Sequence, residues 1–156
     1  MPDLNSPTRS DTYPALYWLT QTSFDVPEDD SWLGANERTM AGRMYFEKRR
    51  RDWMLGRWTA KRATLSYLGL GPEPSQFAKL EILAAPDGAP EAFLDGQSAP
   101  VSLSISHSAG AAFCLIGAHD IALGCDLEQI QPREPNFAAS NGAPRNILED
   151  GSLPVR

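Results

Sequence analysis

Two acidic side chains lie two residues apart near the end of a largely apolar run. They are Asp126 and Glu128 in the segment Gly124-Cys125-Asp126-Leu127-Glu128. The run reads as a strand, and side chains two apart on a strand point to the same face, roughly 6–7 Å apart along the chain. Carboxylate oxygens are the ligands that Mg²⁺ prefers. The spacing therefore predicts a magnesium site, and the alternative is a pair of solvent-facing acids at a strand end.

A histidine flanked by serines lies about twenty residues upstream, in the segment Ser104-Ile105-Ser106-His107-Ser108. An imidazole N–H and neighbouring hydroxyls can all donate hydrogen bonds to a phosphate. The alternative is a surface histidine that follows a strand. His119 is the other histidine of the chain and receives no role.

Most of the basic residues lie between positions 38 and 62. Arg38, Arg51, Arg57 and Lys61 could hold phosphates through charge-assisted hydrogen bonds. The alternative is a solvated basic face of a helix. Spacing does not choose among these four residues.

The composition narrows the class of protein. A net charge of −6 argues against sequence-independent binding to nucleic acid, which needs a basic surface. No apolar run approaches the ~18 residues of a membrane span, and the N-terminus lacks the features of a signal peptide. Cys114 and Cys125 are expected to be buried free thiols and not a disulfide or metal framework. We therefore expect a cytoplasmic protein without membrane or nucleic-acid partners.

The pattern of apolar residues predicts an α+β fold, an antiparallel sheet packed against a long basic helical region. One long helix or two consecutive helices are expected over 36–68, ending at Gly69, with an apolar stripe that Lys61 interrupts. A loop is expected over 71–75. Strands are expected over 13–20, 79–85, 91–94, 101–106, 111–117 and 121–128.

The last two predicted strands suggest a position for the acids. If residues 118–119 form a two-residue turn, Asp126 lies opposite Ala111 and Glu128 opposite Ala109. A slip of one residue in this pairing would turn both acids to the other face of the sheet.

The chain divides into three parts by composition. Residues 1–12 are polar and expected to be disordered, and residues 13–130 form one subdomain. Residues 131–156 form an irregular tail without periodicity. We interpret that tail as the product of a truncation or frameshift.

These motifs together resemble the 4′-phosphopantetheinyl transferases of the larger, two-subdomain type. The resemblance rests on residues 49–69 (RRRDWMLGRWTAKRATLSYLG), 103–117 (LSISHSAGAAFCLIG) and 121–133 (IALGCDLEQIQPR). It implies one pseudo-repeat of that fold, corresponding to the N-terminal half of such an enzyme.

The resemblance also implies an activity: transfer of phosphopantetheine from coenzyme A to a serine of an acyl or peptidyl carrier protein. Asp126 and Glu128 would be Mg²⁺ ligands, with the coenzyme's pyrophosphate completing the shell. Ser106 and His107 would contact the nucleotide end of the coenzyme. Arg38 and Arg51 would approach its 3′-phosphate or adenine.

The chain departs from the family in its second half. That half normally carries a W-x-x-K-E motif, whose Glu is a third metal ligand and whose Lys lies beside the chemistry. Here no Trp follows Trp58 and no Lys follows Lys79, and the G-x-P turn at residues 88–90 lacks the basic residue common in the family. The catalytic residues of the missing half are therefore not assigned.

Two hypotheses follow from this departure. The first is a transferase, impaired in this chain or completed by a second polypeptide. The second is an inactive half-domain that retains weak binding of coenzyme A or Mg²⁺, or a role in subunit interaction. In either case we expect self-association, because the face that the missing half would cover is apolar.

Overall fold

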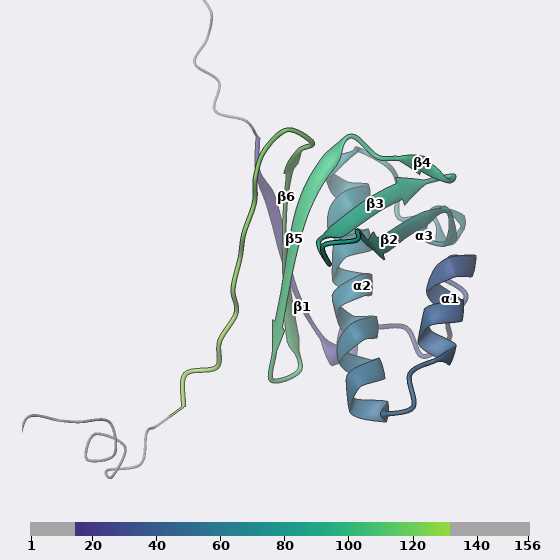
Figure 1. Cartoon of the computed structure of the whole chain (residues 1–156), viewed down its shortest axis with the longest axis vertical. Coiled ribbons are helices and arrows are strands. Elements are labelled where there is room, and N and C mark those ends of the chain that lie inside the picture. The colour runs from purple at the N-terminus through teal and green to yellow at the C-terminus, as the bar shows by residue number, and fades with distance from the viewer. Residues whose placement is uncertain (1–14, 132–156) are drawn as a thin grey trace, which may run out of the picture.

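A computed structural model of the chain describes residues 15–131 (Figure 1). In chain order the elements are β1 (Tyr17–Thr22), η1 (Ser23–Asp25), α1 (Ala35–Gly42), α2 (Glu47–Tyr67), α3 (Pro74–Lys79), β2 (Leu80–Ala84), β3 (Pro90–Leu94), β4 (Gln97–Ser98), β5 (Val101–Ser108) and β6 (Ala111–Ala118). The predicted parts 1–12 and 132–156 lie outside the described residues. Within those described, no helix has the length and apolar character needed to cross a membrane.

The strands form two antiparallel sheets, with orders β1-β6-β5 and β2-β3-β4. Helix α2 runs along one face of the larger sheet and contacts all three of its strands. Figure 1 shows the smaller sheet and α1 on the other side of α2. The predicted α+β class, with an antiparallel sheet packed on a helical region, is confirmed.

The helical region consists of two helices, separated by residues 43–46. Helix α2 ends at Tyr67 with Leu68 as its C-cap, and Gly69 follows with a φ of +67°, as predicted for a glycine that terminates a helix. Pro74 begins α3 inside the predicted loop over 71–75, because proline fits the first turn of a helix.

The core lies between α2 and the two sheets. In β5, Val101 and Leu103 are buried on the α2 side, and the serines of the strand point to the opposite, outer face. Many of the other buried apolar residues come from α2, from β2 and from β6, among them Leu55, Ala60, Leu80, Ile82, Cys114 and Ile116. The predicted alternation in β5 is confirmed.

The predicted pairing of residues 111–117 with 121–128 is wrong. Strand β6 is the central strand of its sheet, so β1 and β5 already occupy both of its edges. Ala111 pairs with Ser108 and Thr22, and therefore cannot lie opposite Asp126. Ala109, predicted to lie opposite Glu128, instead forms the β5–β6 turn with Gly110, at positive φ values that suit a two-residue hairpin.

Residues 121–128, which we call the acidic segment, are extended but form no ladder with a strand. The chain turns after β6, where the Ile121 N–H donates to the Ala118 carbonyl. Figure 1 shows the segment then passing along the sheet on the side away from α2. The segment therefore covers the outer face of the sheet and does not extend its edge.

Candidate nucleotide and metal site

The side chains of the acidic segment alternate between the sheet and solvent. Ile121, Leu123, Cys125 and Leu127 are half-buried, whereas Asp126 and Glu128 are exposed. Both carboxylates therefore lie on the solvent side of the segment. The sequence predicted this shared side, although it placed the segment in the wrong position.

Serines of β5 attach the acidic segment to the sheet. The Cys125 N–H donates to Ser104 Oγ at 3.1 Å, and the Leu127 N–H donates to Ser106 Oγ at 2.9 Å. Ser106 in turn donates to Asp126 Oδ1 at 3.2 Å. The two bonded serines are two residues apart on β5, and their partners are two residues apart in the same order on the acidic segment, so the segment runs parallel to β5. It is bonded to β5 through side chains instead of backbone carbonyls.

The two carboxylates fit a magnesium ion that shares its coordination shell with a substrate. Mg²⁺ is usually bound through one or two carboxylates together with phosphate oxygens and water, not by an all-protein cage. Residues 15–131 contain no group of three or more His, Cys, Asp or Glu side chains arranged to hold a metal. Asp126 and Glu128 could thus hold the ion only together with oxygens of a bound phosphate.

His107 points to the opposite side of β5 from Ser106. It lies at the rim of a hollow of about 190 Å³ between α2, β5 and the β2–β3 turn. Asp52, Trp53 and Arg57 of α2 and Gly88 and Pro90 of the turn also line this hollow. The histidine of the Ser-His-Ser motif is thus brought next to one arginine of α2 and to the G-x-P turn.

Arg57 is the cation that this hollow contains. Its guanidinium carbon lies 4.9 Å from the centroid of the Trp53 ring, and its Nε is buried without a hydrogen-bond partner among the described residues. Burial lowers the pKa of Arg57 from its ordinary value, and the charge of Glu37 only partly offsets this effect. A desolvated guanidinium with free donors is a binding group for an anion such as phosphate.

Arg38 and Arg51, the two arginines that the family resemblance suggests as contacts of the coenzyme, lie elsewhere. Arg38 on α1 donates to the Ser31 carbonyl at 3.3 Å. Arg51 is largely exposed, lies 3.8 Å from Glu47, and lines a groove that also contains Glu28 and further acids. Neither residue lines the hollow beside His107. The spacing that could have singled out Arg57 is its position four residues after Trp53, which allows the two side chains to stack on one helix face.

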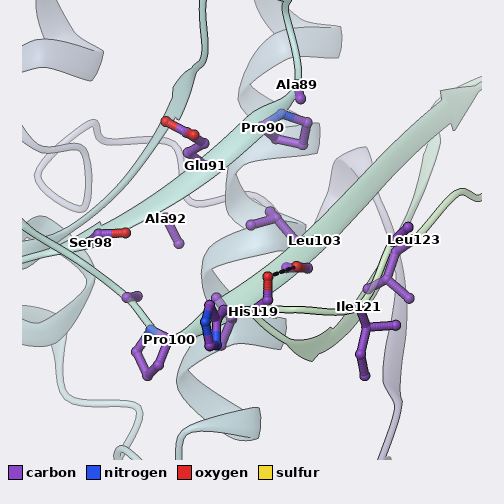
Figure 2. A pocket seen from close by; sticks show the side chains of 14 residues that line it. Ala89, Pro90, Glu91, Ala92, Ser98, Pro100, Leu103, His119, Ile121 and Leu123 are labelled. Atoms are coloured by element: carbon purple, nitrogen blue, oxygen red, sulfur yellow. Dashed lines mark hydrogen bonds between the residues drawn. The ribbon is translucent and has the colours of Figure 1, made fainter.

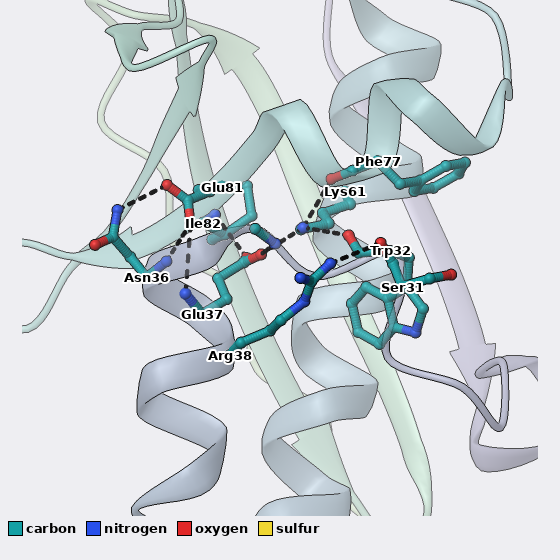
Figure 3. Close-up of polar contacts among 10 residues, drawn as sticks. Ser31, Trp32, Asn36, Glu37, Arg38, Lys61, Phe77, Glu81 and Ile82 are labelled. Atoms are coloured by element: carbon teal, nitrogen blue, oxygen red, sulfur yellow. Dashed lines mark hydrogen bonds and ion pairs between the residues drawn. The ribbon is translucent and has the colours of Figure 1, made fainter.

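Lys61 serves the fold instead of a ligand (Figure 3). It is fully buried, forms an ion pair with Glu37, and donates to the carbonyls of Trp32 and Phe77 at 2.8 Å each. The Glu37 carboxylate also accepts from the Ile82 N–H at 2.9 Å. Burial lowers the pKa of Lys61, and the charge of Glu37 acts in the opposite direction. This pair explains why a lysine interrupts the apolar stripe of α2.

Helix α2 contains Trp58, Lys61 and Arg62 at W-x-x-K spacing, with a cation after the lysine. Arg62 is exposed and contributes to the lowered pKa of Asp25, after the hydrogen bonds that this carboxyl receives from Thr22. Helix α2 lies on the face of the larger sheet opposite to the acidic segment. Arg62 is therefore not placed beside Asp126 and Glu128.

A second hollow, of about 600 Å³, has a different lining (Figure 2). It lies between β3, β5 and the start of the acidic segment. Its lining is largely Ala, Pro, Leu and Ile, with Glu91 as the carboxylate. At one side of this hollow, Ser102 Oγ donates to the His119 carbonyl at 2.9 Å. This contact of His119 is made by its backbone. Without a basic side chain besides His119, this hollow is poorly suited to a phosphate.

Solved structures with the same fold are holo-acyl-carrier-protein synthases. The enzyme of Bacillus anthracis, in complex with coenzyme A (3′,5′-ADP), has a TM-score of 0.55 and 23% identity over 66% of this chain and 93% of its own. The enzyme of Thermotoga maritima has a TM-score of 0.53 and 24% identity over 66% of this chain and 61% of its own. The enzyme of Neisseria meningitidis has a TM-score of 0.53 and 17% identity over 66% of this chain and 95% of its own. No protein-family model and no curated protein matches the sequence.

The described part of the chain therefore has the same fold as these holo-acyl-carrier-protein synthases. At these identities the likeness is one of fold. The similar region spans nearly the whole of the B. anthracis and N. meningitidis chains, so one unit of this kind makes up almost all of each of those chains.

Proposed function

We propose that this chain is a 4′-phosphopantetheinyl transferase that moves the phosphopantetheine group of coenzyme A to a serine of an acyl or peptidyl carrier protein. The observation that carries this proposal is the hollow in which Arg57, with its unpaired Nε, lies beside His107. Fold likeness to holo-acyl-carrier-protein synthases supports the same class of reaction.

Each residue has a part in this proposal. Arg57 and His107 bind a phosphate at the nucleotide end of the coenzyme through charged and neutral N–H donors. We assign this contact to Arg57 in preference to Arg38 and Arg51, because four acidic side chains share the groove of Arg51, against Asp52 in the hollow of Arg57, and because Arg38 already has a partner. Asp126 and Glu128 hold Mg²⁺, which supplies positive charge to the pyrophosphate oxygens.

In the reaction, the carrier protein's serine oxygen bonds to the phosphorus that bears the pantetheine arm. The bond from that phosphorus to the bridging oxygen breaks, and adenosine 3′,5′-bisphosphate leaves. Charge grows on the leaving phosphate during this step, and an ion held by Asp126 and Glu128 would supply the positive charge that stabilises it. The base that accepts the serine proton is not assigned among the described residues.

A slow reaction is expected of this chain. Asp126 and Glu128 lie in a segment on the face of the larger sheet away from α2, whereas Arg57 and His107 line a hollow beside α2. This separation favours the second candidate function, an inactive domain that binds coenzyme A weakly. We also propose that the exposed Trp18 and Leu16 form part of a surface for self-association or for a complementing second half.

Mass spectrometry of apo carrier proteins incubated with this chain, coenzyme A and MgCl₂ tests the transfer. Both an acyl and a peptidyl carrier protein should be offered, and calorimetry with coenzyme A should be run beside the assay. Gain of the phosphopantetheine mass supports the transferase. Binding of coenzyme A without mass gain supports the inactive domain, and the absence of both contradicts the assignment of the site.

A further inference from the structure

The outer face of β5 carries serines at every second position, and three of the four, Ser102, Ser104 and Ser106, hydrogen-bond to the chain that follows β6. Ser102 donates to the His119 carbonyl, Ser104 accepts from the Cys125 N–H, and Ser106 accepts from the Leu127 N–H. A serine row on an exposed strand face would ordinarily be solvated. Here the row provides the hydrogen bonds that a neighbouring strand would otherwise supply.

Ser106 differs from the other two serines because it also contacts a carboxylate. Its hydroxyl accepts from the Leu127 N–H at 2.9 Å and donates to Asp126 Oδ1 at 3.2 Å. The same Oδ1 atom accepts from the Leu127 N–H at 2.9 Å. One carboxylate oxygen is thus fixed by two donors, while Oδ2 receives no hydrogen bond from residues 15–131.

We propose that Ser106 is a positioning residue that holds Asp126 through one carboxylate oxygen and leaves the other oxygen free to bind a divalent cation. This rests on the proposed metal site, and it replaces the contact between Ser106 and a nucleotide that the sequence suggested. The donor of Ser106 is already used by Asp126, and its side chain lies on the opposite face of β5 from His107. Ser106 would therefore act through Asp126 without contacting the coenzyme.

The physical need for such a residue follows from the structure of the acidic segment. The segment is not held by a backbone ladder, so its carboxylates would otherwise rotate and shift freely at the protein surface. Restricting a ligand before the ion binds lowers the entropy lost on binding. Positioning of this kind should affect affinity for the bare ion, before any coenzyme or carrier protein is present.

The test uses the full chain and MnCl₂ as the probe. Calorimetry and electron paramagnetic resonance measure Mn²⁺ binding, and amide hydrogen exchange measures the protection of the Leu127 N–H. Ser106→Ala should weaken Mn²⁺ binding about three- to tenfold and speed exchange at Leu127 about fivefold, the effect of one lost hydrogen bond. Ser106→Thr keeps the hydroxyl and should restore both values. Ser102→Ala is the matched control on the same strand face and should leave both unchanged.

The variant Asp126→Asn separates the claim that Asp126 is a metal ligand from the claim that Ser106 positions it. If this variant loses Mn²⁺ binding while Ser106→Ala binds like the wild type and leaves Leu127 exchange unaltered, Asp126 is a ligand and the positioning role of Ser106 is refuted. If Asp126→Asn binds Mn²⁺ unchanged, the metal site of the proposed function is wrong, and positioning for a cation is refuted with it.

Discussion

Replacing Lys61 with Met should destabilise the fold strongly, although the new side chain is apolar and similar in length. Lys61 is fully buried and is bonded to Glu37 and to the carbonyls of Trp32 and Phe77 (Figure 3). The substitution leaves the Glu37 carboxylate buried without its counter-charge, and it removes the donor from both carbonyls. The contacts join α2 to α1, to the segment before α1 and to α3.

The expected size of the effect follows from those contacts. Removing one partner of a buried ion pair typically costs about 3–5 kcal/mol, and each buried carbonyl left without a donor costs about 1 kcal/mol or more. Part of this loss is recovered because Glu37 keeps the N–H groups of Gly34 and Ile82 as donors. We therefore expect the free energy of unfolding to fall by about 4 kcal/mol, a large share of the about 5–15 kcal/mol of a typical domain.

Urea denaturation followed by circular dichroism at pH 7 measures this effect. With a slope of about 2 kcal/mol per molar urea, the midpoint should fall by about 2 M. The matched control is Lys48→Met on the exposed face of α2, which should change stability by less than about 0.5 kcal/mol. The double variant Glu37→Gln/Lys61→Met should lose less than the sum of the single variants, because it leaves no unpaired charge.

A midpoint of Lys61→Met within about 0.5 M of the wild type would refute this reasoning. It would mean that Lys61 Nζ and the Glu37 carboxylate do not stabilise the fold as a pair, and that Lys61 is free to meet a ligand. If the losses of the two single variants add up to the loss of the double variant, Lys61 and Glu37 are not energetically coupled.

Three further predictions concern the thiols, the phosphate site and the exposed face. Burial raises the pKa of Cys114 to about 12 from its ordinary value of 9.0, so the unfolded thiol ionises first as the pH rises. Stability should therefore fall above pH 9, by about 2 kcal/mol at pH 10.5, and Cys114→Ala should abolish that slope in denaturation curves recorded across this range. Arg57→Ala should weaken calorimetric binding of coenzyme A about tenfold or more, whereas Arg51→Ala should change it less than threefold; equal effects would contradict the assigned phosphate site. Trp18→Lys should reduce the mass of the chain measured by light scattering, and a monomeric wild type would contradict self-association.

Local features of the sequence determined much of the fold. Apolar alternation predicted β5 and β6, and glycine and proline fixed where α2 ends and where β2 turns into β3, because these signals depend on neighbouring residues only. The shared side of Asp126 and Glu128 followed from the two-residue period of an extended chain, and this holds whether or not the segment joins a sheet.

Contacts between distant residues decided the rest. The sequence does not say that β1 occupies the second edge of β6, and this occupancy forces the acidic segment onto the outer face of the sheet. Four cations of the helical region looked equivalent along the chain. Packing buried Lys61 against Glu37 and placed Arg57 beside His107, because burial and charge pairing depend on which elements meet in three dimensions.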